Sequence, residues 1–175
     1  MKSLLELMLA RRSVRKYTAD PIKDEKIETI LRAGLLAPSG HSKYPLEFIV
    51  VKDKETLEKM SHCRVGAAKM LAGAAAAIVV IADVEQSDMW VEDASIAMMG
   101  MHLMATELGL GSCWVQVRLR EAEDGRASEE FLREFLEFPS NYQCASILSI
   151  GEAERTPKPH ELDKLKLEKI HREKF

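Results

Sequence analysis

The chain has 175 residues, 46% of them hydrophobic and 30% charged, with a formal net charge of −3. This composition is typical of a single globular domain with enough apolar material for a sizeable core. The slight acidity argues against a general surface for nucleic acids, whose binding proteins carry a basic excess. The three cysteines show no CxxC spacing, which argues against a zinc site or a disulfide framework.

The first residues do not follow the pattern of a signal peptide, because Lys2 and Glu6 place charge beside and inside the short apolar run. No uncharged stretch reaches the length of a membrane span. An odd number of cysteines fits a reducing compartment. We therefore expect a cytoplasmic protein that has no membrane partner.

Helical signals occupy the first part of the chain. Ser3 and Glu6 form a capping box in front of a first helix. A second, amphipathic helix carries Ile27 and Ile30 on one face and ends before Pro38. Each helix is followed by a polar segment that is a candidate binding element.

The middle of the chain mixes strands and helices. A strand is predicted over residues 48–51 and a helix over about 56–73. The run 77–82 is apolar on both faces, which predicts a buried central strand. Residues 93–108 form a long helix, closed by Gly109, that is apolar almost all round. Such a helix lies in the middle of a domain or at a subunit interface.

The last part begins with a short apolar strand over 113–117, in which Cys113 is expected to be a buried, inert thiol. A helix near 128–136 and a strand over 146–150 follow, and then a charged tail over 152–175 that contains prolines. Helices and strands do not alternate in a regular βαβ pattern, so the predicted fold class is α+β.

The stretch Arg11-Arg12-Ser13-Val14-Arg15 gathers three guanidiniums and a hydroxyl directly after the first helix. Guanidiniums are planar, permanently charged donors that suit phosphate. The stretch is therefore a candidate anion site. A structural alternative stays open, since arginines at a helix end can also satisfy its carbonyls and pair with acids.

Two further loops stand out. The loop 37–42, Ala-Pro-Ser-Gly-His-Ser, has small side chains that would let a flat ligand approach closely, although it could be a simple connection. The segment 108–114 contains a GxG, but it follows a helix and precedes a strand, the reverse of the order in a dinucleotide-binding loop. We expect it to pack a helix tightly against a strand. No metal-binding spacing, GxSxG elbow or P-loop occurs.

Taken in order, these segments resemble the FMN-dependent nitroreductase family. The resemblance rests on residues 11–15, on 37–42, on the long helix and Gly-Leu-Gly-Ser-Cys-Trp turn of 93–114, and on Ser-Ile-Gly at 149–151 leading to Lys-Ile-His at 169–171. It covers nearly the whole chain and implies one FMN-binding domain over residues 1–175. The implied fold is a central, mostly antiparallel sheet flanked by helices, in an intertwined homodimer whose FMN sites each take residues from both chains.

By this resemblance, Arg11, Arg12 and Ser13 would hold the FMN phosphate, with Lys164 of the tail as a further ligand. Arg15 would lie beside the pyrimidine side of the flavin ring, where a fixed cation stabilises the negative charge of the reduced ring. The remaining cofactor-binding residues, contributed by the loop of the partner chain and by the strand that passes the ring, would be Pro38, Ser39, Gly40, Ser42, Trp114, Val115 and Gln116.

The resemblance implies an oxidoreductase that passes hydride from NAD(P)H through FMN to a nitroaromatic, a quinone or a similar acceptor, in a ping-pong cycle. No side chain need act as a nucleophile and no metal is expected, because the cofactor carries the chemistry. Two alternatives stay open: a flavin-binding sensor or storage module without turnover, and a non-enzymatic protein whose arginines contact acidic partners.

Overall fold

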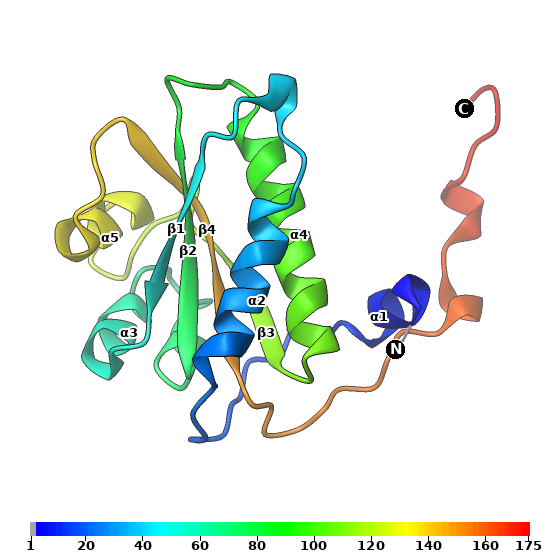
Figure 1. Cartoon of the computed structure of the whole chain (residues 1–175), viewed down its shortest axis with the longest axis horizontal. Coiled ribbons are helices and arrows are strands. Elements are labelled where there is room, and N and C mark those ends of the chain that lie inside the picture. The colour runs from blue at the N-terminus through cyan, green and yellow to red at the C-terminus, as the bar shows by residue number, and fades with distance from the viewer. Residues whose placement is uncertain (1–2) are drawn as a thin grey trace.

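An antiparallel sheet organises the computed structural model, which describes residues 3–175 (Figure 1). Its strands are β1 (Leu46–Val51), β2 (Ala76–Asp83), β3 (Gly111–Gln116) and β4 (Tyr142–Gly151), and they lie in the order β1-β2-β4-β3. All three pairings are antiparallel. The α+β class with a central antiparallel sheet is therefore confirmed.

Helices cover both faces of the sheet. The α-helices of the described chain are α1 (Leu4–Ala10), α2 (Asp24–Leu35), α3 (Lys54–Met60), α4 (Trp90–Glu107) and α5 (Ser128–Leu136). Short 3₁₀ turns are η1 (Gly40–Ser42), η2 (Lys69–Leu71), η3 (Leu162–Lys164) and η4 (Leu167–Lys169). Figure 1 shows α2 and α4 on one face of the sheet and α3 and α5 on the other. Within residues 3–175, no helix has both the length and the apolar character needed to cross a bilayer.

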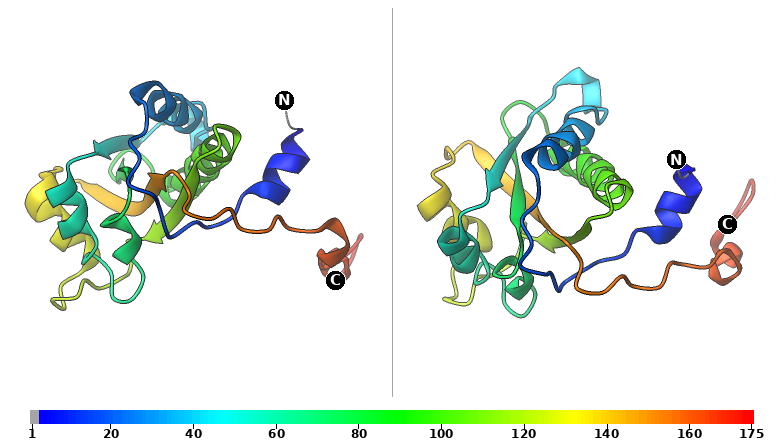
Figure 2. Two further views of the ribbon diagram at one scale, coloured as in Figure 1. Left: turned by 90° about the horizontal axis from the view of Figure 1, so that it is seen from below. Right: turned by 60° about the horizontal axis from the view of Figure 1, so that its bottom comes forward.

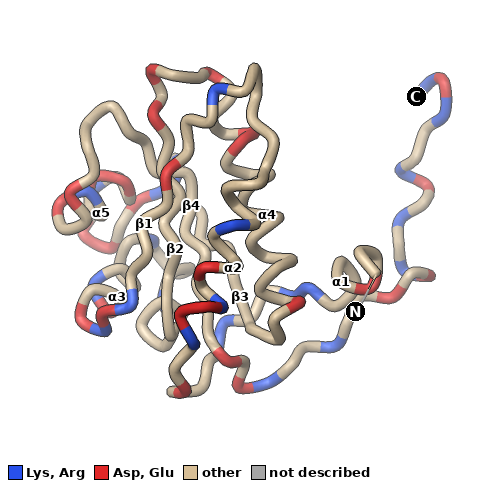
Figure 3. Tube along the Cα trace, viewed as in Figure 1, with Lys and Arg blue, Asp and Glu red and all other residues tan. Residues whose placement is uncertain are grey.

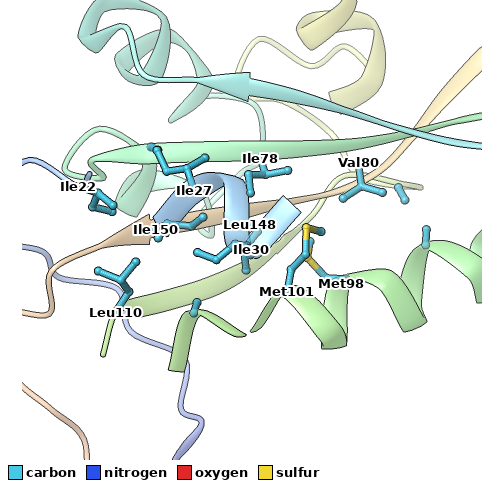
Figure 4. Packing of buried hydrophobic residues seen from close by; sticks show 14 of the residues in the cluster. Ile22, Ile27, Ile30, Ile78, Val80, Met98, Met101, Leu110, Leu148 and Ile150 are labelled. Atoms are coloured by element: carbon cyan, nitrogen blue, oxygen red, sulfur yellow. The ribbon is translucent and has the colours of Figure 1, made fainter. Parts of the chain in front are cut away.

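The central strand β2 serves both cores, as its two apolar faces predict. Ile78 and Val80 point towards α2 and α4, and Val79 and Ile81 point to the opposite face, because side chains alternate along a strand. Figure 4 shows the first core, in which the labelled side chains come from both helices, from the sheet and from the segments just before α2 and after α4: Ile22, Ile27, Ile30, Ile78, Val80, Met98, Met101, Leu110, Leu148 and Ile150.

The predicted helix over about 56–73 is wrong in length, because α3 is much shorter. After α3 the Val65 N–H donates to the Glu121 carbonyl at 3.0 Å, and the Glu123 N–H donates to the His62 carbonyl at 3.0 Å. These long-range hydrogen bonds occupy backbone groups that a longer helix would use. Contacts distant in sequence therefore override the local helical pattern.

The other predicted elements occur with shifted ends. β1 and β4 begin before the predicted 48–51 and 146–150, and α4 begins before the predicted 93–108. β3 starts and ends earlier than the predicted 113–117, whereas α5 has the predicted bounds 128–136. All three cysteine thiols are free and buried, Cys113 included.

The two ends of the chain leave the body together and lie side by side (Figure 2). The predicted capping box is present, since the Glu6 N–H donates to Ser3 Oγ at 3.2 Å and the Ser3 N–H donates to the Glu6 carboxylate at 2.6 Å. The tail runs beside α1, where the His160 N–H donates to the Leu9 carbonyl at 2.8 Å. We call α1 and the residues after position 152 the arm.

Candidate functional site

The candidate anion site is an extended stretch, residues 11–16, that docks on the edge of the sheet; we call it the basic segment. Its Val14 N–H donates to the Ser112 carbonyl at 2.9 Å, and Val14 is buried. A Cβ on Gly111 would come within 2.7 Å of Val14 Cγ1. The second glycine of the GxG therefore serves close packing, as expected, but its partner is the basic segment.

Tyr17 fixes the far end of the basic segment. Its hydroxyl hydrogen-bonds Ser149 Oγ at 2.7 Å and donates to the Val14 carbonyl at 2.8 Å. Burial raises the pKa of Tyr17 well above its ordinary value, so the hydroxyl stays neutral. Gly151 makes room for the ring, because a Cβ there would meet Tyr17 Cδ1 at 2.5 Å. The backbone of the segment is thus held from within the fold.

The side chains of the basic segment that are left outside are mostly donors. Ser13 and Arg15 flank the buried Val14 and line an open hollow together with Lys16 and Arg155. Figure 3 shows Lys and Arg gathered where the chain leaves α1. Within residues 3–175, no carboxylate forms an ion pair with any arginine of the segment. The one carboxylate that lines the same hollow, that of Glu154, forms no ion pair with these donors. Guanidiniums, an ammonium and a hydroxyl that outnumber the acid suit a phosphate ester.

The alternative that these arginines only satisfy backbone carbonyls applies in part to one of them. The Arg12 guanidinium donates to the backbone carbonyl of Lys158, which ties the arm to the basic segment. Arg15 makes only a long contact of 3.5 Å with the Ser13 carbonyl. None of these partners is a carbonyl of α1. Capping of the first helix therefore does not account for the cluster.

A buried histidine supports the segment from behind. His102 of α4 hydrogen-bonds Ser112 Oγ through Nδ1 at 2.8 Å, and Ser112 in turn holds Val14. Burial, and then the positive charge of Arg11, lowers the pKa of His102 to about 4. The imidazole is therefore neutral near pH 7. The sequence analysis missed His102, whose signal was a lone imidazole in an otherwise apolar helix.

The loop 38–44, which includes η1, is tied to the start of α4. The Ser39 hydroxyl donates to Asp93 Oδ2 at 2.6 Å, and the Gly40 N–H donates to Asp93 Oδ1 at 3.0 Å. Three residues of the loop other than glycine have left-handed backbone: His41, Ser42 and Tyr44, with φ of 51°, 54° and 49°. Such residues are uncommon and are usually held by their surroundings. The sequence analysis took Asp93 only as the start of a helix.

The strand residues Trp114, Val115 and Gln116 lie on β3, at an edge of the sheet. The Trp114 indole N–H donates to Gln116 Oε1 at 3.0 Å, and the Gln116 amide donates to the Arg118 carbonyl at 3.1 Å. The Val115 side chain is buried among the residues beneath α5. Because an edge strand leaves alternate backbone groups without a partner strand, β3 can offer main-chain hydrogen bonds to a ligand.

One chain does not bring all the predicted ligands together. Asp93, which binds the loop, and His102, which supports the basic segment, are nine residues apart on α4, about 14 Å along the helix axis. Figure 1 shows η1 and the basic segment at opposite ends of α4. Lys164 of the arm pairs with Glu161 at 2.8 Å, and no hydrogen bond or ion pair of the described chain joins it to the basic segment.

Comparison with known proteins decides the family. A family model described as "Nitroreductase family" matches residues 8–64 and 55–152. The chain belongs to the nitroreductase family. Both the basic segment and the loop 38–44 lie inside the matched nitroreductase residues, whereas Lys164 lies beyond them.

Individual nitroreductase relatives are similar to this chain over nearly its full length. The chain is 41% identical over 180 residues, covering 100% of both chains, to an Archaeoglobus fulgidus protein named "Putative NADH dehydrogenase/NAD(P)H nitroreductase". It is similar in structure to an FMN-dependent nitroreductase from Clostridium difficile R20291, with a TM-score of 0.95, 44% identity and coverage of 98% and 100% of the two chains. A nitroreductase family protein from Clostridium difficile 630 has a TM-score of 0.83 at 28% identity, over 99% and 100%.

Proposed function

We propose that this protein is an FMN-dependent oxidoreductase that takes hydride from NAD(P)H and passes it to a nitroaromatic, a quinone or a similar acceptor. The observation that carries the proposal is the basic segment, a row of donors that form no ion pair with a carboxylate of the described chain and are held in place against β3. Similarity to an FMN-dependent nitroreductase over nearly the whole chain supports FMN as the phosphorylated ligand.

When bound, FMN supplies hydride chemistry that serves donor and acceptor in turn, which is the basis of a ping-pong cycle. The chain's own residues bind and orient it. Arg11, Arg12 and Ser13 take the phosphate, and Lys164 adds a charge from the arm. Arg15, which is exposed beside the same hollow, lies next to the pyrimidine side of the ring and stabilises negative charge there.

The ring side of the site is formed by β3 and by the loop. Trp114, Val115 and Gln116 present their edge-strand backbone to the ring, and the bond between the indole and Gln116 keeps the Trp114 side chain in one orientation. Pro38, Ser39, Gly40 and Ser42 cover the ring from the partner chain. Because the loop and the basic segment lie at opposite ends of α4, a two-chain site supplies both to one FMN.

The arm supports a homodimer. None of the residues of α1 is buried, and Leu4 and Leu5 are 60% and 52% exposed. The tail exposes further apolar side chains, namely Leu162, Leu165, Leu167 and Ile170. A helix of seven residues is not stable by itself in water, and contiguous exposed apolar surface marks protein interfaces. A second copy of the chain, intertwined with the first, would cover these side chains.

FMN binding tests the proposal directly. The purified full-length protein should be yellow and should bind about one FMN per chain, with a higher Tm. If saturating FMN changes neither the absorbance spectrum nor the Tm of the protein, the proposal is contradicted. Such a result would favour the alternative that this chain is a non-enzymatic protein whose arginines contact acidic partners.

Turnover separates the enzyme from a flavin-binding sensor. We expect NADH or NADPH to be oxidised in the presence of a quinone, with parallel lines in double-reciprocal plots. FMN binding without such turnover would leave only the storage or sensor function.

Light scattering of the purified protein should give twice the chain mass of 19.7 kDa, and a monomer at micromolar concentration would exclude the two-chain site.

A further inference from the structure

Asp93 is a buried carboxylate whose hydrogen bonds go to a loop. It is 3% exposed and lies in the first turn of α4. No Lys, Arg or His of the described chain forms an ion pair with it. Burying a charge without a cation is unfavourable unless hydrogen bonds satisfy it. The donors that satisfy Asp93 are the Ser39 hydroxyl and the Gly40 N–H, so the carboxylate and the loop depend on each other.

The Ser39 hydroxyl extends this connection through the loop. While it donates to Asp93, its oxygen accepts the Tyr44 N–H at 2.9 Å. One carboxylate therefore controls both ends of the turn from Ser39 to Tyr44. Between these ends lie the left-handed residues His41 and Ser42. This conformation is intrinsically disfavoured for side-chain-bearing residues and persists only where the surroundings enforce it.

Gly40 brings the loop close enough to α4 for this contact. A Cβ at Gly40 would lie 2.5 Å from Met89 Cε and 3.0 Å from Met89 Sδ. Met89 directly precedes α4, so the backbone of the loop packs against the helix start. The N–H of Gly40 can then reach Asp93 one turn further along.

We propose that Asp93 is the positioning residue of the loop 38–44: acting through Ser39 and Gly40, it holds the loop in its binding conformation before FMN arrives and so sets the affinity for FMN. The inference rests on the proposed function and deepens it. A binding loop ordered in advance loses less conformational entropy on association, which strengthens binding without a new ligand contact.

The first test measures order in the loop of the full-length protein without added FMN. Amide hydrogen exchange of a peptide covering residues 38–46 is compared between wild type, Asp93→Ala, Asp93→Asn and the control Glu92→Gln. Glu92 is exposed in the same turn of α4, so its variant removes an equal charge from the helix start. We expect exchange at least tenfold faster in Asp93→Ala, an intermediate rate in Asp93→Asn and the wild-type rate in Glu92→Gln.

The second test titrates the same proteins with FMN and follows flavin fluorescence. Kd should rise at least tenfold in Asp93→Ala and about threefold in Asp93→Asn, whose side-chain oxygen can still accept the Gly40 N–H, and should stay unchanged in Glu92→Gln. A purely structural role would move Tm without this graded change in Kd. If Asp93→Ala does not fold, Asp93→Asn against Glu92→Gln decides the question.

The outcomes separate the two proposals. Equal loop exchange in the Asp93 variants and Glu92→Gln would overturn the positioning role, and so would a loosened loop with an unchanged FMN Kd; in both cases the proposed function would stand. A wild-type chain that binds no FMN would overturn the proposed function, and with it the role of Asp93 towards FMN.

Discussion

Val14 packs against Gly111 so closely that a Cβ on the glycine would lie 2.7 Å from Val14 Cγ1 and 3.2 Å from the Cβ of Ala153. This contact joins the basic segment, β3 and the start of the tail at one point. Any side chain at position 111 must push the basic segment outwards. The distance between the basic segment and β3 therefore depends on Gly111, which has no side chain.

Gly111→Ala is expected to lower the free energy of unfolding by about 1 to 3 kcal/mol, the usual effect of overpacking. FMN should also bind more weakly, because the segment that we propose as the phosphate site is displaced. Denaturant titration and FMN titration measure the two effects. Gly73→Ala is the matched control, since its added Cβ would meet only a backbone oxygen at 4.0 Å. A variant at position 111 with wild-type values in both titrations would contradict this account of the contact.

Arg11→Ala is expected to weaken FMN binding by roughly 10- to 100-fold, which corresponds to the loss of one hydrogen bond between charged groups. Riboflavin, which has no phosphate, is the internal control, and its binding should change little. Comparing the Kd values for FMN and riboflavin in wild type and variant isolates the contribution of the phosphate to binding. Equal weakening for both ligands would show that Arg11 acts on the fold or on the ring.

Arg15→Ala should make bound FMN harder to reduce, because the variant removes the cation that we propose lies beside the ring. We expect the midpoint potential to fall by about 30 mV, equivalent to about 1.4 kcal/mol for a two-electron couple. Spectroelectrochemical titration gives the value. Lys16→Ala removes the same charge from the neighbouring exposed position and should shift the potential less. An unchanged potential in Arg15→Ala would remove this residue from the ring side of the site.

His102 predicts a loss of stability in mild acid. Its pKa is about 4 in the folded protein, below its ordinary value of 6.5, so the unfolded chain takes up a proton first as the pH falls. The free energy of unfolding should therefore decrease between about pH 6.5 and pH 4, by roughly 2 to 3 kcal/mol from this group, and no further below that window.

His102→Asn should remove that part of the pH dependence. The measurement is urea unfolding near pH 7 and near pH 4.5 at one protein concentration, comparing the difference between the two conditions in wild type and variant. His171→Asn changes an exposed histidine and should keep the wild-type difference. If His102→Asn keeps it too, then another group is responsible for the acid sensitivity.

Much of the fold could be predicted because its signals are local. The capping box needs only Ser3 and Glu6, and both of its hydrogen bonds are present. The central position of β2 follows from an apolar run on both faces. Gly109 ends α4 with a φ of 77°, a conformation that glycine adopts readily. In each case the residues that make the interaction are neighbours in the chain.

The family and the candidate FMN-binding residues could also be predicted from the sequence, since the basic segment and the loop 38–44 are short motifs in a recognisable order. Their relative placement was not accessible. The length of α3 depends on Val65 and Glu121, and the anchoring of the basic segment depends on His102, Ser112 and Tyr17. No local pattern specifies such partners.

Local patterns in the sequence therefore determined most of the elements and the α+β class, and they marked the arginine cluster as a candidate anion site. Only the tertiary structure decided which buried groups hold those residues in place. The physical reason is the range of the interactions: a capping box spans three residues, whereas the bond from Ser39 to Asp93 spans 54 and depends on the packing of α2 against α4.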